Sequence, residues 1–309
     1  GLGNTTGWWN SIAGGDFDRD GDIDYVVGNL GLNSRLQASV SQPVTIYAKD
    51  FDRNRRLDPI ITYYLNGTEY PIYKRDQLLE QIPSMRSRFP TYEEYAQTPF
   101  KDFFSKEQLG DAFIRKATRF ETSYIKNLGD GKFSIRPLPA KVQWAPVFGL
   151  EVRDVNGDQL LDILAIGNSY APDVITGRLN ASIGTLLAGD GSGGFKPISH
   201  RESGFFVDGD GKGLITLQLE KGKLLYVASQ NNDSLLVFED LNSPPGNVLI
   251  PPEVASHIII TYQDGSTEKR ELYYGSGYLS QSTRKVILPK NVETIVLYNF
   301  QGEQEMLDQ

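Results

Sequence analysis

Short apolar runs alternate with turn signals along the first 240 residues of the chain. The runs 24–29, 58–64 and 162–168 are rich in Val, Ile, Leu and Tyr, which is typical of β-strands. Each run follows an acidic loop, and a short strand-like stretch precedes that loop. Asp-Gly turns within 127–133 and 188–195 then predict closing hairpins. We therefore expect four-stranded antiparallel units that must stack to bury their faces, as the blades of a β-propeller do.

A fourth, less regular unit is predicted from about residue 204 onward. Its loop begins at Asp208 and carries Lys212 at position 5, where the other loops carry an Asp or Asn. An ammonium group at that place can replace the charge of a metal ion, so no calcium is expected there. Its strands are expected at 213–219, 223–229 and 234–238.

An insertion with different chemistry interrupts the repeat at residues 72–122. Helical spacing at 75–83 and 91–96 predicts two helices, and a capping box at 105–108 predicts a third that runs into 109–115. Aromatic residues are dense in this insertion. We expect them either to pack onto the propeller or to shape a cap for a ligand or partner.

The last part of the chain follows a proline-containing linker at about residue 244. Alternating strands there predict a small β module. The expected domains are thus 1–243, containing the insertion 72–122, and 244–309. The strands of the β module are expected at 257–262, 267–274, 285–288 and 294–298.

Three acidic loops share one internal spacing, with Asp or Asn at positions 1, 3, 5 and 9. Alternate residues of a tight loop can direct their oxygens to one point, and the backbone carbonyl at position 7 can add a ligand. These ligands are all hard oxygens, which favours calcium over zinc or copper, and we expect two to three ions. The candidate ligands are Asp16, Asp18, Asp20, Asp22 and Asp24 in the first loop, Asp50, Asp52, Asn54, Arg56 and Asp58 in the second, and Asp154, Asn156, Asp158, Leu160 and Asp162 in the third.

The alternative is that these loops are ordinary turns, because Asp, Asn and Gly also form turns without a metal. Four aspartates in register would repel one another strongly without a cation, which favours calcium in the first loop. Position 6 needs a sharp turn that Gly permits most easily. Arg55 and Gln159 occupy that position in the second and third loops, which makes both poorer matches.

Composition narrows the choice of partners. The net charge of −8 argues against nucleic acid or an anionic membrane surface. The chain has no cysteine, so disulfides and a thiol nucleophile are excluded. No apolar run reaches the roughly 18 residues of a membrane span, and no signal peptide is evident. Because the chain begins at Gly1 as if cut from something longer, we expect an exported or processed protein.

The first acidic loop and the run that follows it resemble FG-GAP/VCBS repeats, the calcium-loop blades also found in integrin α-chain propellers. The hairpins at 127–133 and 188–195 are similar to the closing turn of VCBS repeats, and 274–284 is similar to the ASPIC/UnbV domain that commonly follows them. The resemblance covers about 1–68, 123–240 and 250–309.

This resemblance implies calcium ligation at the loop positions named above. It also implies a large exported or surface-anchored bacterial protein of the Bacteroidetes type, in which an outer-membrane lipoprotein is one expected form. Propellers of this kind have about seven blades, so the four evident units are expected either to be a fragment or to close with other segments.

Catalytic signatures are scarce. The two histidines, His200 and His257, have no nucleophile pattern beside them, and no G-x-S-x-G, P-loop or H-E-x-x-H motif occurs. The first hypothesis is a non-catalytic calcium-binding surface or secreted module that binds a protein or glycan. Two alternatives stay open: a carbohydrate-active lyase or glycosidase with its site between propeller and insertion, and a structural subunit of an outer-membrane complex.

Overall fold

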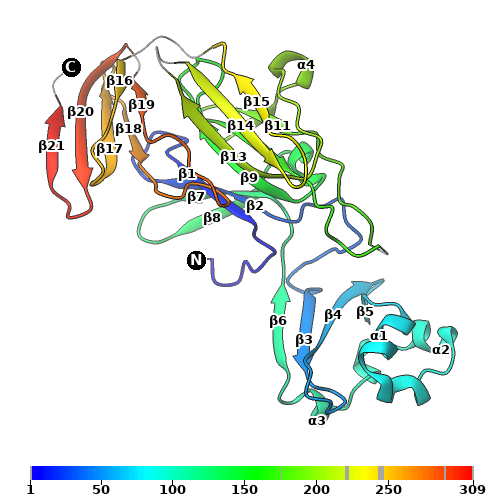
Figure 1. Ribbon diagram of the computed structural model, residues 1–309. Helices are drawn as coiled ribbons and strands as arrows, with labels where there is room; N and C mark the ends of the chain where they lie inside the picture. The colour runs from blue at the N-terminus through cyan, green and yellow to red at the C-terminus, as the bar shows by residue number, and fades with distance from the viewer. Residues whose placement is uncertain (1, 175, 220–222, 243–246, 289, 308–309) are drawn as a thin grey trace. The chain divides into compact units, whose positions relative to one another are not determined.

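The prediction of a mainly β protein is confirmed by the computed structural model, in which antiparallel sheets dominate and helices are short (Figure 1). None of the described helices is long and apolar enough to span a membrane. Contacts divide the chain into two units: the sheet unit, Trp9–Asn33 with Glu121–Gln309, and the insert unit, Leu2–Trp8 with Ser34–Phe120. The described residues are 2–174, 176–219, 223–242, 247–288 and 290–307.

The insert unit is built on one four-stranded antiparallel sheet of order β5-β4-β3-β6. Its strands are β3 (Val44–Lys49), β4 (Asp58–Leu65), β5 (Thr68–Pro71) and β6 (Phe113–Ala117). Its helices are α1 (Arg75–Gln81), η1 (Pro83–Ser87), α2 (Tyr92–Gln97), η2 (Phe100–Asp102) and α3 (Lys106–Leu109). The second acidic loop, which joins β3 to β4, therefore belongs to the same unit as the helices.

The aromatic residues of the insertion form a core with this sheet. Phe89, Phe100 and Phe103 are each at most 2% exposed, and they pack together with Ile60 of β4. Tyr47 of β3 lies against Phe100, with 4.6 Å between the ring centroids. The insert unit thus has a hydrophobic core of its own.

The predicted helix from 105 into 115 is wrong in its second half. The capping box is present, since the Ser105 side chain accepts a hydrogen bond from the Gln108 backbone N–H. The helix nevertheless ends at Leu109, and Phe113–Ala117 forms strand β6, paired with β3. Gly110 weakens the helix at this point, and pairing with a distant strand then overrides the local preference.

The sheet unit contains three antiparallel sheets, of order β1-β2-β7-β8, β12-β11-β10-β9 and β13-β14-β15. The first two have the predicted order of strand, acidic loop, strand and hairpin, and the insert unit separates β2 from β7. The third has three strands. Their bounds are β1 (Ser11–Gly15), β2 (Asp24–Gly28), β7 (Ser123–Asn127), β8 (Phe133–Pro137), β9 (Val147–Arg153), β10 (Asp162–Gly167), β11 (Thr185–Gly189), β12 (Phe195–Pro197), β13 (Gly211–Gln218), β14 (Leu224–Gln230) and β15 (Leu236–Glu239), with the short helices η3 (Ala140–Gln143) and α4 (His200–Ser203) between them.

These three sheets pack on one another in chain order. Successive residues of β10 point to opposite faces. Ile163 belongs to the core that Val26 of the first sheet also lines, whereas Leu164 belongs to the core that contains Leu214 of the third sheet. The first strands of the sheets lie side by side, because β9 contacts both β1 and β13.

The C-terminal β module holds a four-stranded sheet of order β18-β17-β20-β21 and a separate pair, β16-β19. The strands predicted at 257–262 and 294–298 are present, while β16 and β21 were not predicted. Strand β18 ends three residues earlier than predicted. The bounds are β16 (Asn247–Leu249), β17 (Ala255–Tyr262), β18 (Thr267–Glu271), β19 (Val286–Leu288), β20 (Val292–Asn299) and β21 (Gln304–Leu307).

A buried carboxyl group joins this module to the sheets. Glu151 of β9 accepts one hydrogen bond from the Thr216 hydroxyl of β13 and another from the Ser282 hydroxyl, both at 2.8 Å. The Ser282 oxygen in turn accepts the backbone N–H of Thr216 at 3.0 Å. Burial raises the pKa of Glu151, and the nearby charge of Arg153 and the two hydroxyl donors lower it in part.

Glu151→Gln tests how the charge of Glu151 at this junction affects stability. A carboxyl group with a raised pKa in the folded protein favours folding at low pH, and this contribution is lost as the pH rises through the folded-state pKa. The stability of the variant relative to the parent should therefore increase from about pH 4 to about pH 8. Urea unfolding at the two pH values measures this difference. The exposed Glu293→Gln is the control, and a pH-independent difference for Glu151→Gln would contradict the prediction.

Candidate metal centre

The three acidic loops share one backbone conformation. In each of them, positions 4 and 6 have positive φ angles, a region that Gly adopts more easily than other residues. Arg55 and Gln159 adopt this conformation at position 6 in spite of their side chains, each with φ 69°. The residues concerned are Arg19 and Gly21, Arg53 and Arg55, and Gly157 and Gln159.

The carboxylate at position 1 organises each turn. In the first loop, Asp16 Oδ1 accepts the backbone N–H of Asp20 at 3.1 Å, and Oδ2 accepts that of Gly21 at 3.2 Å. Asp50 accepts the equivalent N–H groups of Asn54 and Arg55 in the second loop. In the third loop, Asp154 accepts the N–H groups of Gly157 and Gln159.

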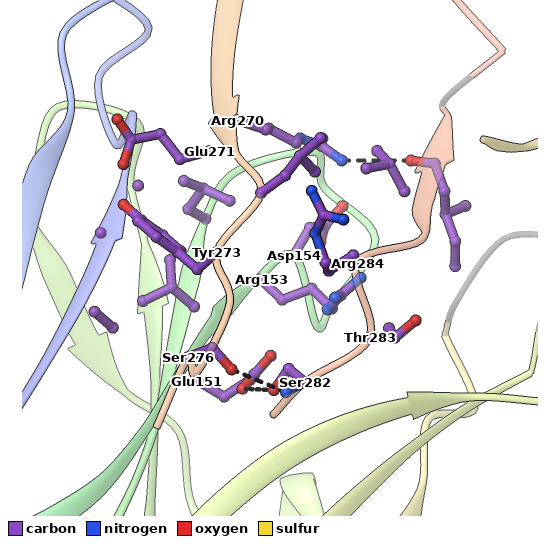
Figure 2. A pocket seen from close by; sticks show the side chains of 18 of the residues that line it. Glu151, Arg153, Asp154, Arg270, Glu271, Tyr273, Ser276, Ser282, Thr283 and Arg284 are labelled. Carbon is purple, nitrogen blue, oxygen red and sulfur yellow. Dashed lines mark hydrogen bonds between the residues drawn. The ribbon is translucent and has the colours of Figure 1, made fainter. Parts of the chain in front are cut away.

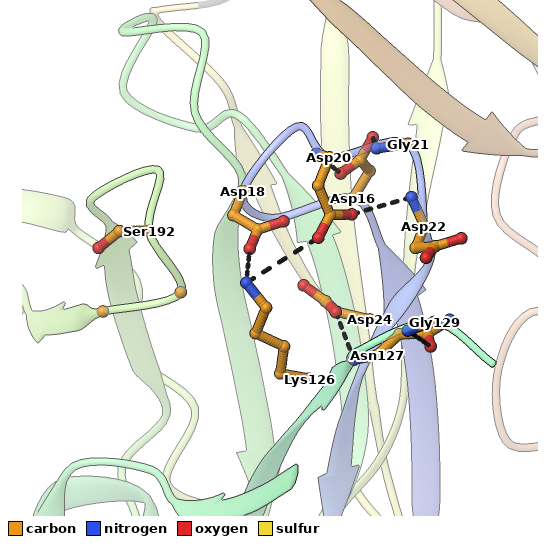
Figure 3. Close-up of polar contacts among 12 residues, drawn as sticks. Asp16, Asp18, Asp20, Gly21, Asp22, Asp24, Lys126, Asn127, Gly129 and Ser192 are labelled. Atoms are coloured by element: carbon orange, nitrogen blue, oxygen red, sulfur yellow. Dashed lines mark hydrogen bonds and ion pairs between the residues drawn. The ribbon is translucent and has the colours of Figure 1, made fainter. Parts of the chain in front are cut away.

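The first loop gathers three carboxylates at one point (Figure 3). One oxygen from each of Asp16, Asp18 and Asp20 lies within 4.8 Å of the others. Asp24 is fully buried below them, where it accepts the backbone N–H of Asn127 at 2.8 Å. The side chain of Asp22 is exposed, so only its backbone carbonyl remains a candidate at position 7.

A lysine of β7 reaches this group of carboxylates. The ammonium group of Lys126 forms an ion pair with Asp18, and its Nζ lies 3.9 Å from an oxygen of Asp20. Local spacing gives no signal for this contact, because Lys126 follows the loop by more than 100 residues. In the fourth loop, Lys212 pairs with the buried Asp210 at 2.7 Å, as its place in the sequence had indicated.

One lysine leaves the first loop short of positive charge. Asp18 Oδ1 is buried and has no hydrogen-bond partner. Burial raises the pKa of Asp16 to about 6, although N–H donors from Lys269 and Gly21 lower it, while the charges of Asp20 and Glu268 raise it further. A divalent cation would supply both the missing charge and a partner for the free oxygen.

The second loop also gathers three carboxylates, from Asp50, Asp52 and Asp58. Burial raises the pKa of Asp58, and the charges of Asp52 and Asp50 raise it further. Among the described residues, no lysine or arginine forms an ion pair with these three groups. Asn54 Oδ1 accepts the backbone N–H of Arg56 at 2.8 Å, so the side-chain amide of Asn54 stabilises the turn.

In the third loop the side chains mostly bind the loop itself. Asn156 donates its amide N–H to Asp158 at 2.9 Å, and Asp158 also accepts the N–H of Leu160. Asp162 accepts the N–H groups of Val155 and Gly189, and burial raises its pKa to about 6. Within the described part of the chain, three acidic oxygens converge only in the first and second loops.

The two histidines have structural contacts. His200 Nδ1 lies 2.9 Å from the carbonyl oxygen of Phe205. The ring of His257 stacks on Tyr298, with 4.5 Å between centroids. Its Nδ1 is 3.0 Å from the Ser256 hydroxyl, which also lies 3.0 Å from two backbone carbonyls.

Comparison with models of known protein families gives no match, and no curated protein matches the chain. The FG-GAP/VCBS and ASPIC/UnbV resemblances therefore stay predictions.

Lys126→Gln tests how the first loop balances its charge. In metal-free buffer we expect this variant to lose about 1 to 3 kcal/mol of stability, because the partly buried Asp18 loses its partner. Added calcium should then stabilise the variant more than the parent, since the ion no longer competes with an ammonium group. Unfolding in EDTA and in calcium measures both effects. The exposed Lys132→Gln in the adjoining hairpin is the control, and equal stability of parent and Lys126→Gln in EDTA would refute the proposed balance.

Proposed function

We propose that this chain is a non-catalytic, calcium-stabilised binding module of a surface or secreted protein. The observation that carries the proposal is the convergence of three carboxylates in each of two loops with the same backbone turn. Loops that only reverse the chain have no need to concentrate negative charge in this way, since one Asx side chain is sufficient for a turn.

Calcium in these loops would be structural. In the first loop, Asp16, Asp18 and Asp20 would bind the ion, which would fix the turn between β1 and β2. In the second, Asp50, Asp52 and Asp58 would do the same between β3 and β4. The third loop is a weaker third site. If the protein is a surface or secreted one, the expected dissociation constants are roughly 10⁻⁴ to 10⁻³ M, the range of extracellular calcium modules.

We also propose that the three sheets of the sheet unit are propeller blades. Two features support this arrangement: the sheets pack face to face in chain order, and their first strands lie side by side, as strands around a propeller axis do. Closed propellers have roughly four to eight blades. Further blades, supplied by another part of the protein or by another chain, are therefore among the proposed partners, with a protein or glycan as the bound ligand.

Calcium titration tests the metal proposal. Calcium at about 100 times its dissociation constant should add about 2.7 kcal/mol of stability per site. Thermal unfolding of the full chain in EDTA, in magnesium and in calcium measures this gain, which should be specific for calcium. We expect Asp20→Ala to remove the gain that the first loop contributes and Asp52→Ala to remove the gain that the second loop contributes.

Asp233→Ala provides the matched control, because Asp233 is exposed and lies outside the acidic loops. It should respond to calcium as the parent does. Unfolding temperatures that are the same in EDTA and in calcium would mean that the loops are plain turns, and the calcium proposal would fail.

A further inference from the structure

A cavity in the sheet unit lies beside the third acidic loop and is distinct from the carboxylate clusters of the first and second loops. It lies between strands β1 and β9 on one side and residues 268–291 of the C-terminal module on the other (Figure 2). Its volume is about 710 Å³, which falls within the roughly 300 to 1,000 Å³ typical of small-molecule sites.

The lining of this cavity is basic, although the chain as a whole carries a net charge of −8. Six basic side chains line it, compared with four acidic ones. The basic residues are Arg153, Lys269, Arg270, Arg284, Lys285 and Lys290, and the acidic residues are Glu151, Asp154, Glu268 and Glu271.

Three of the four acids already have partners. Glu268 pairs with Arg270 and accepts a hydrogen bond from the Tyr262 hydroxyl. Glu151 accepts two hydroxyl donors at the junction described above. Both oxygens of Asp154 accept backbone N–H groups of its own loop. Each of these acids therefore already accepts hydrogen bonds, and Glu151 also lies near enough to Arg153 for the arginine charge to lower its pKa.

Arg153 is one of five basic residues of the lining, all except Arg270, that make no ion pair among the described residues. Its Nε is buried with no hydrogen-bond partner. The Nε of Arg284 is also buried without a partner. The terminal nitrogens of Arg284, however, donate to the Tyr274 hydroxyl and to the carbonyl oxygen of Ala255, whereas no hydrogen bond is formed by those of Arg153 among the described residues. A buried guanidinium N–H without a partner is unfavourable, and a carboxylate satisfies it with two parallel hydrogen bonds.

The cavity also offers a free acceptor and several neutral polar groups. Asn291 Oδ1 is buried and without a partner, while the amide nitrogen of Asn291 donates to Gln159. Ser276, Thr283 and Tyr273 bring hydroxyl groups to the lining. A ligand that fits this set needs one negative group for Arg153 and hydroxyl donors for acceptors such as Asn291.

We infer that this cavity binds a carboxylate-bearing sugar of the hexuronate class. Its single carboxylate would pair with Arg153, its hydroxyl groups would meet Asn291 and the neighbouring hydroxyls, and the apolar faces of its ring would lie against side chains such as Val152 and Leu272. The inference rests on the proposed binding function, with a glycan as ligand, and it does not depend on bound calcium.

The test is calorimetric titration of the full chain with D-glucuronate and, as the neutral counterpart with the same ring, D-glucose. We expect glucuronate to bind and glucose to bind at least about tenfold more weakly. Arg153→Gln should reduce glucuronate affinity about tenfold or more, and Arg153→Lys should lose less because it keeps the charge. Asn291→Leu should also weaken glucuronate binding, independently of the arginine.

Arg201→Gln is the matched control, since Arg201 is exposed on α4 and does not line the cavity. Unfolding curves establish that each variant is folded. The inference is overturned if the parent does not bind glucuronate, if glucose binds equally well, or if folded Arg153→Gln binds as the parent does. The titrations are run in calcium and in EDTA, so glucuronate binding is measured with and without the ion. The calcium proposal is tested separately by the unfolding temperatures, and either proposal can therefore fail without the other.

Discussion

In three of the four-stranded sheets, the acidic turn depends on a carboxylate at its first position that binds backbone N–H groups while it is wholly or partly removed from water. A single such group is easily accommodated, but the loops of this protein add two or three more acids around it. The gathered charge then has to be balanced by a cation. Lys126 and Lys212 show that the chain can supply that cation from a side chain, and among the described residues no lysine pairs with the acids of the second loop. Similar acidic turns thus differ in how far the chain's own side chains balance their charge.

The junction at Glu151 shows a different use of a buried carboxyl group. It receives hydroxyl donors from two separate segments and so joins the C-terminal module to the second and third sheets. Ser282, which supplies one of these donors, also lines the basic cavity. The segment between β18 and β19 therefore both binds the module to the sheets and forms part of the cavity wall.

Features set by neighbouring residues could be predicted from the sequence. The spacing of Asp and Asn residues predicted the common turn of the acidic loops, and the pattern of apolar and polar residues predicted most of the strands. Both features depend on residues that are neighbours in the chain. Features that depend on distant residues were missed. Lys126 is placed beside Asp18 by strand pairing, and Phe113–Ala117 becomes a strand because β3 presents a free edge. The sequence gives no signal that Arg153 lines a cavity, because the cavity is formed by segments more than 100 residues apart in the chain.

The insert unit enters the chain between β2 and β7, two strands that are paired in the same sheet. During synthesis, β1 and β2 therefore emerge long before the strand that covers their open edge. An unpaired edge of that kind can pair with other chains, and closing a long loop delays the correct pairing. The insert unit has its own core and can fold while the ribosome completes residues 121–137. The first sheet is thus begun before the insert unit is synthesised and can be completed only after it.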